Sequence, residues 1–326
     1  MRHYLITGGA GFIGSNLIRH LFATEKDIFI SCIDSFDPFY PRAIKELNIS
    51  DFEASQNFQL LEEDLSKIKG KQLAETISKP VDVIVHLAAK AGVRPSIADP
   101  LAYQQANVIG LQNLLDFAKE KNIKQFVFAS SSSVYGLNDH FPWEEEENVL
   151  PVSPYGMTKL AGELLGQVFS RLFGLRFIAL RFFTVYGPGQ RPDLAIHKFT
   201  KRILENKPIQ MFGDGGTSRD YTYIDDTVRG IVAAMKYAAS DFEVINLGNN
   251  YSVELKDLIH KIEETIGQKA VIEKLPEQVG DLPKTFAEIS KAKNLLGYEP
   301  KTKFEDGLKI FYEWFLDNKE LLLKAE

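Results

Sequence analysis

The stretch LITGGAGFIGSNLIRHLF, residues 5–22, decides the fold of the first half of the chain. It has the pattern of a short apolar strand, a glycine-rich turn and an amphipathic helix. Gly8, Gly11 and Gly14 would allow a tight turn, a close approach of the backbone to a diphosphate, and close packing of helix against strand. The helix N-terminus would supply N–H donors to the anion. The stretch therefore predicts a dinucleotide-binding unit at the start of the chain.

Two acidic residues further along indicate which dinucleotide would bind. Asp34 follows Gly14 by 20 residues, at the end of a second apolar run. An acid at this position binds the 2'-hydroxyl of the adenosine ribose and would repel a 2'-phosphate, so we expect NAD rather than NADP. Asp64, which follows FQLLEE, is a candidate for a hydrogen bond to the adenine amino group, or a plain surface carboxylate. A glycine turn without a cofactor remains the alternative for the whole motif.

Apolar, β-rich runs alternate with longer helix-patterned segments through roughly the first 180 residues. Several runs are apolar on both faces, as expected of parallel strands that are covered by helices above and below. We therefore predict an α/β fold with a Rossmann-type, doubly wound parallel sheet. The expected strands are residues 3–7, 28–34, 58–63, 81–87, 125–130 and 176–183.

After residue 184 the chain is richer in Gly, Pro and loops. Helical patterns persist there, and EVINLG (243–248) is expected to be a strand that returns to the first sheet. We therefore predict an NAD-binding domain over 1–183, with returning segments near 219–248, and a smaller, interleaved C-terminal α/β substrate domain over 184–326. The expected helices of this second part are residues 194–206, 225–239, 253–266 and 304–316.

The composition argues against several classes of function. The 326 residues carry a net charge of −6 and no Lys/Arg cluster, so a nucleic-acid partner is not expected. The single cysteine, Cys32, excludes a disulfide framework, and the six histidines lack metal-binding spacing, so no metal site is expected. The chain shows neither a signal-peptide pattern nor an apolar run of about 18 residues, so we expect no membrane association and a cytoplasmic location. The acidic run from Glu144 to Glu147 is interpreted as solvated surface.

A candidate catalytic surface follows QFVFAS, where four serines stand in a row at residues 130–133. Strand carboxyl ends border the ligand crevice of an open α/β sheet, so these hydroxyls are expected there. Downstream, Ser153 and Pro154 are expected to open a helix on which Tyr155 and Lys159, four apart, share one face. The lysine and the positive nicotinamide ring should lower the tyrosine pKa from about 10. The set predicts an acid/base unit that moves a hydroxyl proton while a hydride passes to or from NAD.

Over essentially its full length the chain resembles the extended short-chain dehydrogenase/reductase family. The matching pieces are TGGAGFIG (7–14), HLAA (86–89), NVIG (107–110), SSSSVYG (130–136), YGMTK (155–159), RFFTVYGP (181–188) and RDYTYIDD (219–226). Within that family it is most similar to the UDP-glucuronate 4-epimerases, because of AGVRPS, SSSVYG and LRFFTVYGPGQRPDLA. The resemblance implies an NAD-dependent isomerase that converts UDP-glucuronate to UDP-galacturonate through a transient 4-keto sugar.

The resemblance also implies roles for single residues. Ser131 takes the place of the catalytic Ser/Thr, Tyr155 is the base, and Lys159 stands beside it. Residues expected to hold NAD are Gly8, Gly11, Phe12, Ile13, Gly14, Asp34, Asp64, Leu65, Leu87, Ala88, Ala89, Asn107, Tyr155 and Lys159. Residues expected to hold the UDP-sugar are Ser132, Ser133, Thr184, Arg191, Gln210, Arg219 and Asp281. Among the NAD set, Asn107 matches a structural asparagine of the family.

The residues around the sugar distinguish sibling reactions. A 6-carboxylate requires a guanidinium fork and hydroxyl donors, whereas a neutral 6-hydroxymethyl group does not. We therefore predict that Ser132, Thr184 and Arg191 hold the glucuronate carboxylate, with Ser133 as a further candidate. The alternative for Arg191 is a contact with the diphosphate or with solvent. Related dehydratases carry Asp-Glu immediately before VYG and decarboxylases typically a Glu, so the serines here disfavour both activities.

Several alternatives remain open from the sequence. They are a UDP-glucose/UDP-galactose 4-epimerase, a UDP-glucuronate decarboxylase and an NAD-binding regulator without catalysis. The resemblance implies a homodimer that forms through two helices of the NAD domain. Two residues depart from the family pattern: Lys90 stands where Gln commonly follows HLAA, and Gln278 stands where an arginine often precedes the acid at Asp281. The sequence offers no account of Lys90.

Overall fold

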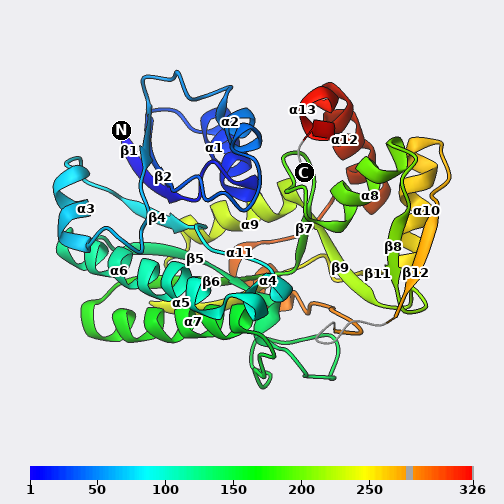
Figure 1. Ribbon diagram of the computed structural model, residues 1–326. Coiled ribbons are helices and arrows are strands. Elements are labelled where there is room, and N and C mark those ends of the chain that lie inside the picture. The colour runs from blue at the N-terminus through cyan, green and yellow to red at the C-terminus, as the bar shows by residue number, and fades with distance from the viewer. Residues whose placement is uncertain (277–281, 325–326) are drawn as a thin grey trace.

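The computed structural model describes residues 1–276 and 282–324 (Figure 1). Its centre is a seven-stranded sheet in the order β10-β6-β5-β4-β1-β2-β3, and all of its pairings are parallel. The strands are β1 (Arg2–Thr7), β2 (Ile28–Asp34), β3 (Phe58–Glu62), β4 (Val83–His86), β5 (Gln125–Ser131), β6 (Arg176–Phe182) and β10 (Phe242–Leu247). The predicted α/β fold with a doubly wound parallel sheet is confirmed.

Helices cover both faces of this sheet (Figure 1). Side chains of a strand alternate between the faces, so Tyr4 and Ile6 lie in one hydrophobic core while Leu5 lies in the other. The first core is closed by α1 (Phe12–Thr24), α2 (Arg42–Ile49) and α9 (Ile224–Lys236), and the second by α3 (Gly70–Thr76), α6 (Gly110–Glu120) and α7 (Pro154–Phe173). This two-sided burial explains why the strands are apolar on both faces.

The element boundaries agree closely with the sequence patterns. The six predicted strands of the first 183 residues are confirmed to within two residues at each end. The segment EVINLG is confirmed as a strand that returns to the large sheet, because β10 pairs with β6 in parallel. The four helices predicted in the second half are also present. They are α8 (Ala195–Leu204), α9 as given above, α10 (Leu255–Ile266) and α12 (Phe304–Asp317).

Two small sheets in the second half were not foreseen. One consists of β7 (Thr184–Tyr186), β9 (Ser218–Tyr223) and β11 (Ser252–Glu254), and the other of β8 (Ile209–Phe212) and β12 (Ile272–Leu275). The strand β9 lies in the segment that was expected to return to the NAD domain, yet it pairs with β7 and β11. The division of the chain at 183/184 stays a prediction. The remaining helical segments are α4 (Val93–Ala98), α5 (Pro100–Gln104), a π-helical turn (Gln105–Ile109), a 3₁₀ turn (Ser132–Val134), α11 (Ser290–Leu296) and α13 (Lys319–Lys324).

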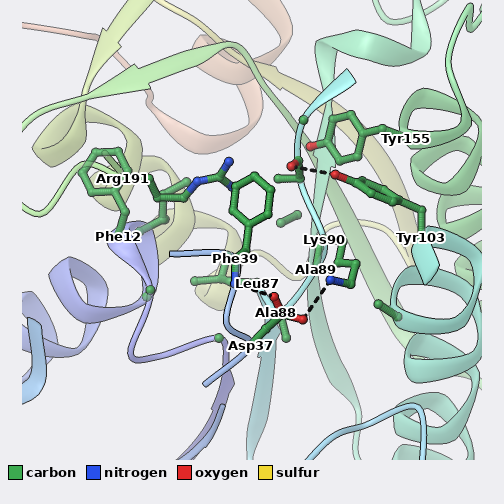
Figure 2. Close-up of a pocket in the computed structure, with 18 of the residues that line it drawn as sticks. Phe12, Asp37, Phe39, Leu87, Ala88, Ala89, Lys90, Tyr103, Tyr155 and Arg191 are labelled. Carbon is green, nitrogen blue, oxygen red and sulfur yellow. Dashed lines mark hydrogen bonds and ion pairs between the residues drawn. The ribbon is translucent and has the colours of Figure 1, made fainter. Parts of the chain in front are cut away.

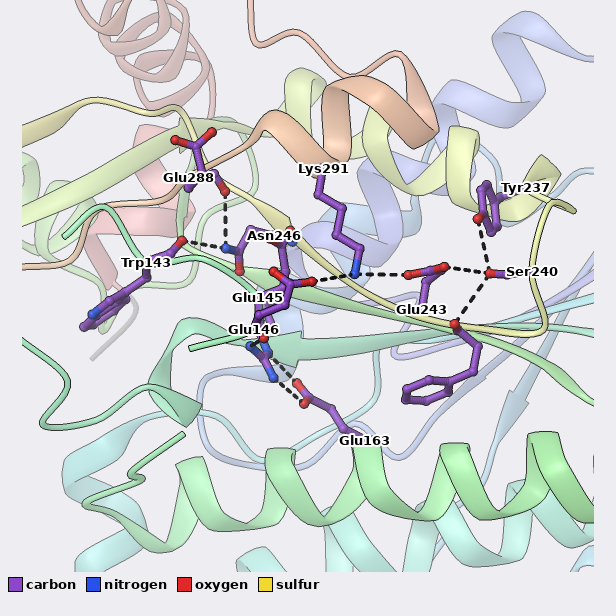
Figure 3. A network of polar contacts seen from close by, with 12 residues as sticks. Trp143, Glu145, Glu146, Glu163, Tyr237, Ser240, Glu243, Asn246, Glu288 and Lys291 are labelled. Carbon is purple, nitrogen blue, oxygen red and sulfur yellow. Dashed lines mark hydrogen bonds and ion pairs between the residues drawn. The ribbon is translucent and has the colours of Figure 1, made fainter. Parts of the chain in front are cut away.

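A buried polar network joins the large sheet to α7 and to the acidic run (Figure 3). Arg181 on β6 donates from Nε and Nη2 to the Glu163 carboxylate at 2.9 and 2.8 Å, and Glu163 also accepts a hydrogen bond from Ser130. Arg181 Nη1 donates to the Glu145 carbonyl at 3.2 Å. The Glu145 carboxylate, 9% exposed, accepts the backbone N–H of Asn246 at 2.7 Å. The solvated-surface interpretation is therefore wrong for Glu145, and burial raises the pKa of its carboxyl group.

In the described ranges, no helix combines the length and apolarity that a membrane crossing requires. The longest, α7, spans 20 residues. It carries buried Lys159 and Glu163 on the face that packs against the sheet.

Candidate active site

A cavity of about 680 Å³ lies at the carboxyl edge of the large sheet (Figure 2). Loops that follow six of the seven strands line it, which is the position where open α/β sheets bind ligands. Most of the predicted site residues share this cavity: Gly8, Gly11, Phe12, Ile13, Gly14, Asp34, Asp64, Leu65, Leu87, Ala88, Ala89, Ser131, Ser132, Ser133, Tyr155, Lys159, Thr184 and Arg191. Residues far apart in the sequence are therefore brought to one pocket.

The glycine turn has the shape that a dinucleotide diphosphate requires. Gly8 has a φ of +72°, and a Cβ there would lie 2.7 Å from the Ala88 backbone nitrogen. A Cβ on Gly14 would lie 2.3 Å from the Gly8 carbonyl oxygen. No described side chain caps α1, and its first turn carries no acidic residue. The first N–H groups of α1 are therefore available to an anion, and the turn fits NAD.

Asp34 ends β2 at the edge of the same cavity. Its carboxylate accepts the backbone N–H groups of Ala10 and Phe36 at 3.1 and 2.9 Å. Lys45 Nζ lies 3.6 Å away, and both side chains are 7% exposed. A carboxylate offers about four acceptor positions, so Asp34 retains capacity for a ribose hydroxyl. Lys45 was not foreseen, because its helix reaches Asp34 only through the tertiary fold.

Asn107 lies behind the cavity. Its side-chain oxygen accepts the Lys90 backbone N–H at 2.8 Å, and its amide nitrogen donates to the Lys90 carbonyl at 3.0 Å. The same nitrogen contacts Thr158 Oγ1 at 2.9 Å. In the structure Asn107 thus ties the segment after β4 to α7, which is a structural role, and its contact with NAD stays a prediction.

The remaining predicted substrate residues lie elsewhere. Gln210 is on β8, and Arg219 is on β9, where its Nη1 donates to the Ser218 carbonyl at 2.8 Å. Neither lines the cavity formed by the described residues. Asp281 lies outside the described residues, as does Gln278. Their assignment to the UDP group stays a prediction.

The helix α7 presents Tyr155 and Lys159 to the cavity. Ser153 Oγ accepts the Gly156 N–H at 3.1 Å, which confirms the predicted helix start. Lys159 Nζ donates to the Ala129 carbonyl at 2.7 Å and lies 5.8 Å from the centre of the Tyr155 ring. The predicted common face of the helix is therefore observed, and the lysine is anchored to the strand that carries the serines.

Burial shifts the pKa values of both Tyr155 and Lys159. Burial raises the pKa of Tyr155, while its hydrogen bond with Ser131 and the charge of Arg191 lower it. Without a nicotinamide ring, desolvation of the phenolate outweighs the nearby donors. The expected decrease includes the charge of that ring and stays a prediction. Burial lowers the pKa of Lys159 to about 7. An amine that titrates near neutral pH is suited to relay a proton.

Arg191 already has a carboxylate partner in the structure. Its Nε and Nη2 donate to Asp193 at 2.9 and 2.6 Å, and the Arg191 side chain is 18% exposed. The guanidinium lies 5.1 Å from the centre of the Phe39 ring. In Figure 2, Arg191 is drawn across the cavity from Tyr155. Asp193, only two residues after Arg191 in GQRPD, could have been considered from the sequence but was missed.

Two further parts of the cavity were also missed. The Tyr103 hydroxyl donates to the Ala91 carbonyl at 3.0 Å, and the Tyr103 ring packs edge-on to Tyr155 with centroids 6.3 Å apart. Lys90 Nζ pairs with Asp37 at 2.8 Å (Figure 2). Tyr103 lies in the short helix α5 and Asp37 in the loop after β2, and neither belongs to a motif, so only their spatial neighbours identify them.

The fold, the glycine turn and the set of Ser131, Tyr155 and Lys159 define an NAD-dependent enzyme of the extended short-chain dehydrogenase/reductase class. More specifically, the chain belongs to the family described as GDP-mannose 4,6 dehydratase, whose model matches residues 5–311. The resemblance inferred from the sequence is thereby confirmed.

Several relatives and solved structures that are similar to this chain are named as UDP-sugar 4-epimerases. A UDP-glucuronate 4-epimerase of Thermodesulfobacterium geofontis is 39% identical over 325 residues, which covers 99% of this chain and 98% of that protein. The crystal structure of UDP-glucuronic acid 4-epimerase from Bacillus cereus, with UDP-glucuronic acid and NAD, is 39% identical with a TM-score of 0.89 and covers 97% and 99% of the two chains. A UDP-glucose 4-epimerase from Thermotoga maritima with UDP-glucose is 32% identical, with a TM-score of 0.88 and the same coverage.

Proposed function

We propose that this protein interconverts UDP-glucuronate and UDP-galacturonate by NAD-dependent epimerisation at C4. The observation that carries the proposal is the gathering of Ser131–Ser133, Thr184, Tyr155 and Arg191 around one cavity. The high similarity to proteins named UDP-glucuronate 4-epimerase supports it. The cytoplasmic location expected from the sequence is part of the same proposal.

The residues at the reacting carbon perform proton transfer and orientation. When bound, NAD supplies a hydride acceptor that is restored in each turnover. Tyr155 takes the proton of the 4-hydroxyl, and Ser131, which helps to lower the pKa of Tyr155, orients that hydroxyl. Lys159, held on the Ala129 carbonyl, receives or returns the proton. The 4-keto sugar must then turn about its diphosphate linkage so that its other face is presented.

The polar groups expected around C6 of the sugar would prevent loss of the carboxylate as CO₂. Oxidation at C4 creates a β-keto acid, which loses CO₂ readily when its carboxylate is poorly solvated and perpendicular to the ketone. Hydroxyls from Ser132 and Thr184, together with Arg191, would keep that carboxylate charged and hydrogen bonded. Because the acids that dehydratases and decarboxylases carry before VYG are serines here, elimination of water and loss of CO₂ lack their extra groups.

One observation favours a second candidate. Asp193 occupies the Nε and Nη2 donors of Arg191, so the guanidinium can offer fewer donors to a substrate carboxylate than an unpaired one would. A site with a neutralised arginine would also accept a neutral hexose. A UDP-glucose/UDP-galactose 4-epimerase is therefore the second candidate.

Proton NMR of the purified, NAD-loaded protein with each UDP-sugar separates these candidates. The proposal expects UDP-galacturonate from UDP-glucuronate, with little turnover of UDP-glucose. Faster turnover of UDP-glucose would support the second candidate. A UDP-pentose with CO₂ release would show a decarboxylase, and bound NAD with no turnover would show a non-catalytic protein.

Arg191→Met tests the carboxylate site. We expect about a 10-fold increase in KM for UDP-glucuronate, because a charge-assisted hydrogen bond contributes about 1.5–3 kcal/mol and Asp193 already shares this guanidinium. The affinity for UDP-glucose, measured as an inhibitor, should change little. Arg42→Met, which breaks a pair with Glu62 outside the cavity, is the matched control. Equal loss for both sugars would assign Arg191 to the diphosphate instead.

The homodimer expected from the sequence also belongs to the proposal. On α7, Leu164, Val168 and Leu172 recur every fourth residue and are 56%, 49% and 68% exposed, and Leu101 and Ile109 of the neighbouring helical run are exposed as well. An apolar stripe of this kind on two adjacent helices is complementary to a second copy of itself related by a two-fold axis.

The combined variant Leu164→Glu and Val168→Glu tests the dimer. Light scattering should give about twice 36.8 kDa for the wild type and the single-chain mass for the variant, because buried like charges would oppose each other across the axis. Val271→Glu, at a site that is 57% exposed elsewhere, should leave the dimer intact. An unchanged mass for the α7 variant would place the interface elsewhere.

A further inference from the structure

The residue Lys90, which departs from the family pattern, forms an ion pair across the dinucleotide crevice. Its Nζ lies 2.8 Å from Asp37 Oδ2, and the two side chains are 31% and 35% exposed. Lys90 follows β4, and Asp37 follows β2. Both line the cavity that also contains the glycine turn. Figure 2 shows the pair beside Ala88 and Ala89.

Both ends of this pair are held firmly by other contacts. The backbone N–H and carbonyl of Lys90 are bonded by the Asn107 side chain, which is linked in turn to Thr158 on α7. The other oxygen of Asp37, Oδ1, accepts the Phe39 N–H at 3.0 Å. The Lys90 backbone is therefore held and the Asp37 carboxylate is oriented within its own loop, so the pair costs less side-chain entropy than one between two mobile surface residues.

The pair joins the loops that follow the two neighbours of β1, the strand that leads into the glycine turn. In the sheet order β4-β1-β2, the strand β1 separates β4 from β2, whose axes lie about 10 Å apart at ordinary strand spacing. A dinucleotide in this fold crosses the same edge from the β2 side, where Asp34 lies, to the β5 side, where Tyr155 and Lys159 lie. The glycine turn and the Lys90–Asp37 pair therefore both border this path.

We propose that the Lys90–Asp37 pair is a clasp over the bound cofactor that slows its exchange with solvent. The inference rests on the NAD site but not on the identity of the sugar. Retention matters for an epimerase, since the hydride that leaves C4 must return in the same turnover. A reduced cofactor that escaped would leave the 4-keto sugar stranded. The pair must open for the dinucleotide to enter or leave, so its strength adds to the barrier for release.

The test is the release rate of NADH from the protein without any UDP-sugar. Protein loaded with NADH is mixed with excess NAD, and the fluorescence change of bound NADH is followed with time. Lys90→Met and Asp37→Asn keep the size of each side chain and the contact of Asp37 with Phe39, but they remove the charge pair. We expect release about 3- to 10-fold faster in each variant, in line with about 1 kcal/mol for a partly exposed pair.

Two further variants make the result specific. The exchanged pair, Lys90→Asp with Asp37→Lys, should release NADH more slowly than either reversed single variant, because attraction across the crevice is restored. Lys261→Met breaks the pair with Glu305 outside the cavity and should match the wild type.

Unchanged release in both charge-removing variants, or slower release, would overturn the clasp. Acceleration by Lys90→Met alone, without rescue by the exchange, would show that Lys90 contacts the cofactor itself. Neither result depends on which sugar the protein turns over.

Discussion

Replacing Tyr155 by Phe should lower kcat/KM for the epimerisation by more than ~100-fold, which is the usual contribution of a general base. The phenol oxygen is the group that takes the 4-hydroxyl proton, and no hydroxyl remains in the variant to do so. Among the described side chains, Ser131 and Lys159 lie near Tyr155, but the Lys159 amine is held on the Ala129 carbonyl and the Ser131 hydroxyl is too weak a base on its own. The measurement is initial rate with UDP-glucuronate at saturating NAD.

The pH dependence distinguishes a base from a structural tyrosine. Because burial raises the pKa of Tyr155, the phenolate population of the free enzyme grows as pH rises, and wild-type kcat/KM should rise with it. The variant should lose this limb and retain its NAD content. Tyr237→Phe removes a hydroxyl bonded to Ser240 outside the cavity and should keep near wild-type activity. A Tyr155→Phe enzyme within a few-fold of wild type would remove this residue from the role of base.

Replacing Arg181 by Met should lower the free energy of unfolding by about 3–5 kcal/mol, the cost of leaving one partner of a buried ion pair alone. Arg181 and Glu163 are each 5% exposed, and in the variant Glu163 would keep only its hydrogen bond from Ser130 (Figure 3). The loss also frees the Glu145 carbonyl, which accepts from Arg181 Nη1. Urea unfolding at a fixed NAD concentration measures the change.

Two further variants show whether Arg181→Met loses stability because Glu163 is left unpaired or because packing is lost. Adding Glu163→Leu to Arg181→Met removes the stranded carboxylate, so the double variant should be more stable than the single one. Arg19→Met breaks an exposed pair with Asp51, with side chains 44% and 47% exposed, and should cost less than about 1 kcal/mol. A loss for Arg181→Met as small as that of Arg19→Met would mean that water or another group solvates Glu163.

Local patterns predicted the parts of the site that depend on spacing along the chain. The glycine turn follows from a bend that requires glycine, Asp34 from its spacing of 20 residues after Gly14, and the shared face of Tyr155 and Lys159 from the helical repeat of 3.6 residues. The parallel sheet then brings strand ends together, which is why the serines after β5 could be placed at the crevice.

Short strands and long-range partners could not be predicted in this way. β7 and β11 have only three residues each, too few to display a periodic pattern. Glu145 looks like any member of an acidic run, and only the approach of the Asn246 N–H and of Arg181 makes it a buried acceptor. The raised pKa of Tyr155 likewise depends on how much water the folded pocket removes.

The sequence by itself determined the sheet, the dinucleotide turn and the chemistry of the catalytic set, because these depend on residue type and on spacing within one strand, turn or helix. The tertiary structure decided the pairing of Arg191 with Asp193, the burial of Glu145 and the link from Lys90 to Asp37. The last two partnerships join segments that are far apart in the chain. For all three, the electrostatic energy depends on distance and desolvation, and the sequence contains neither quantity.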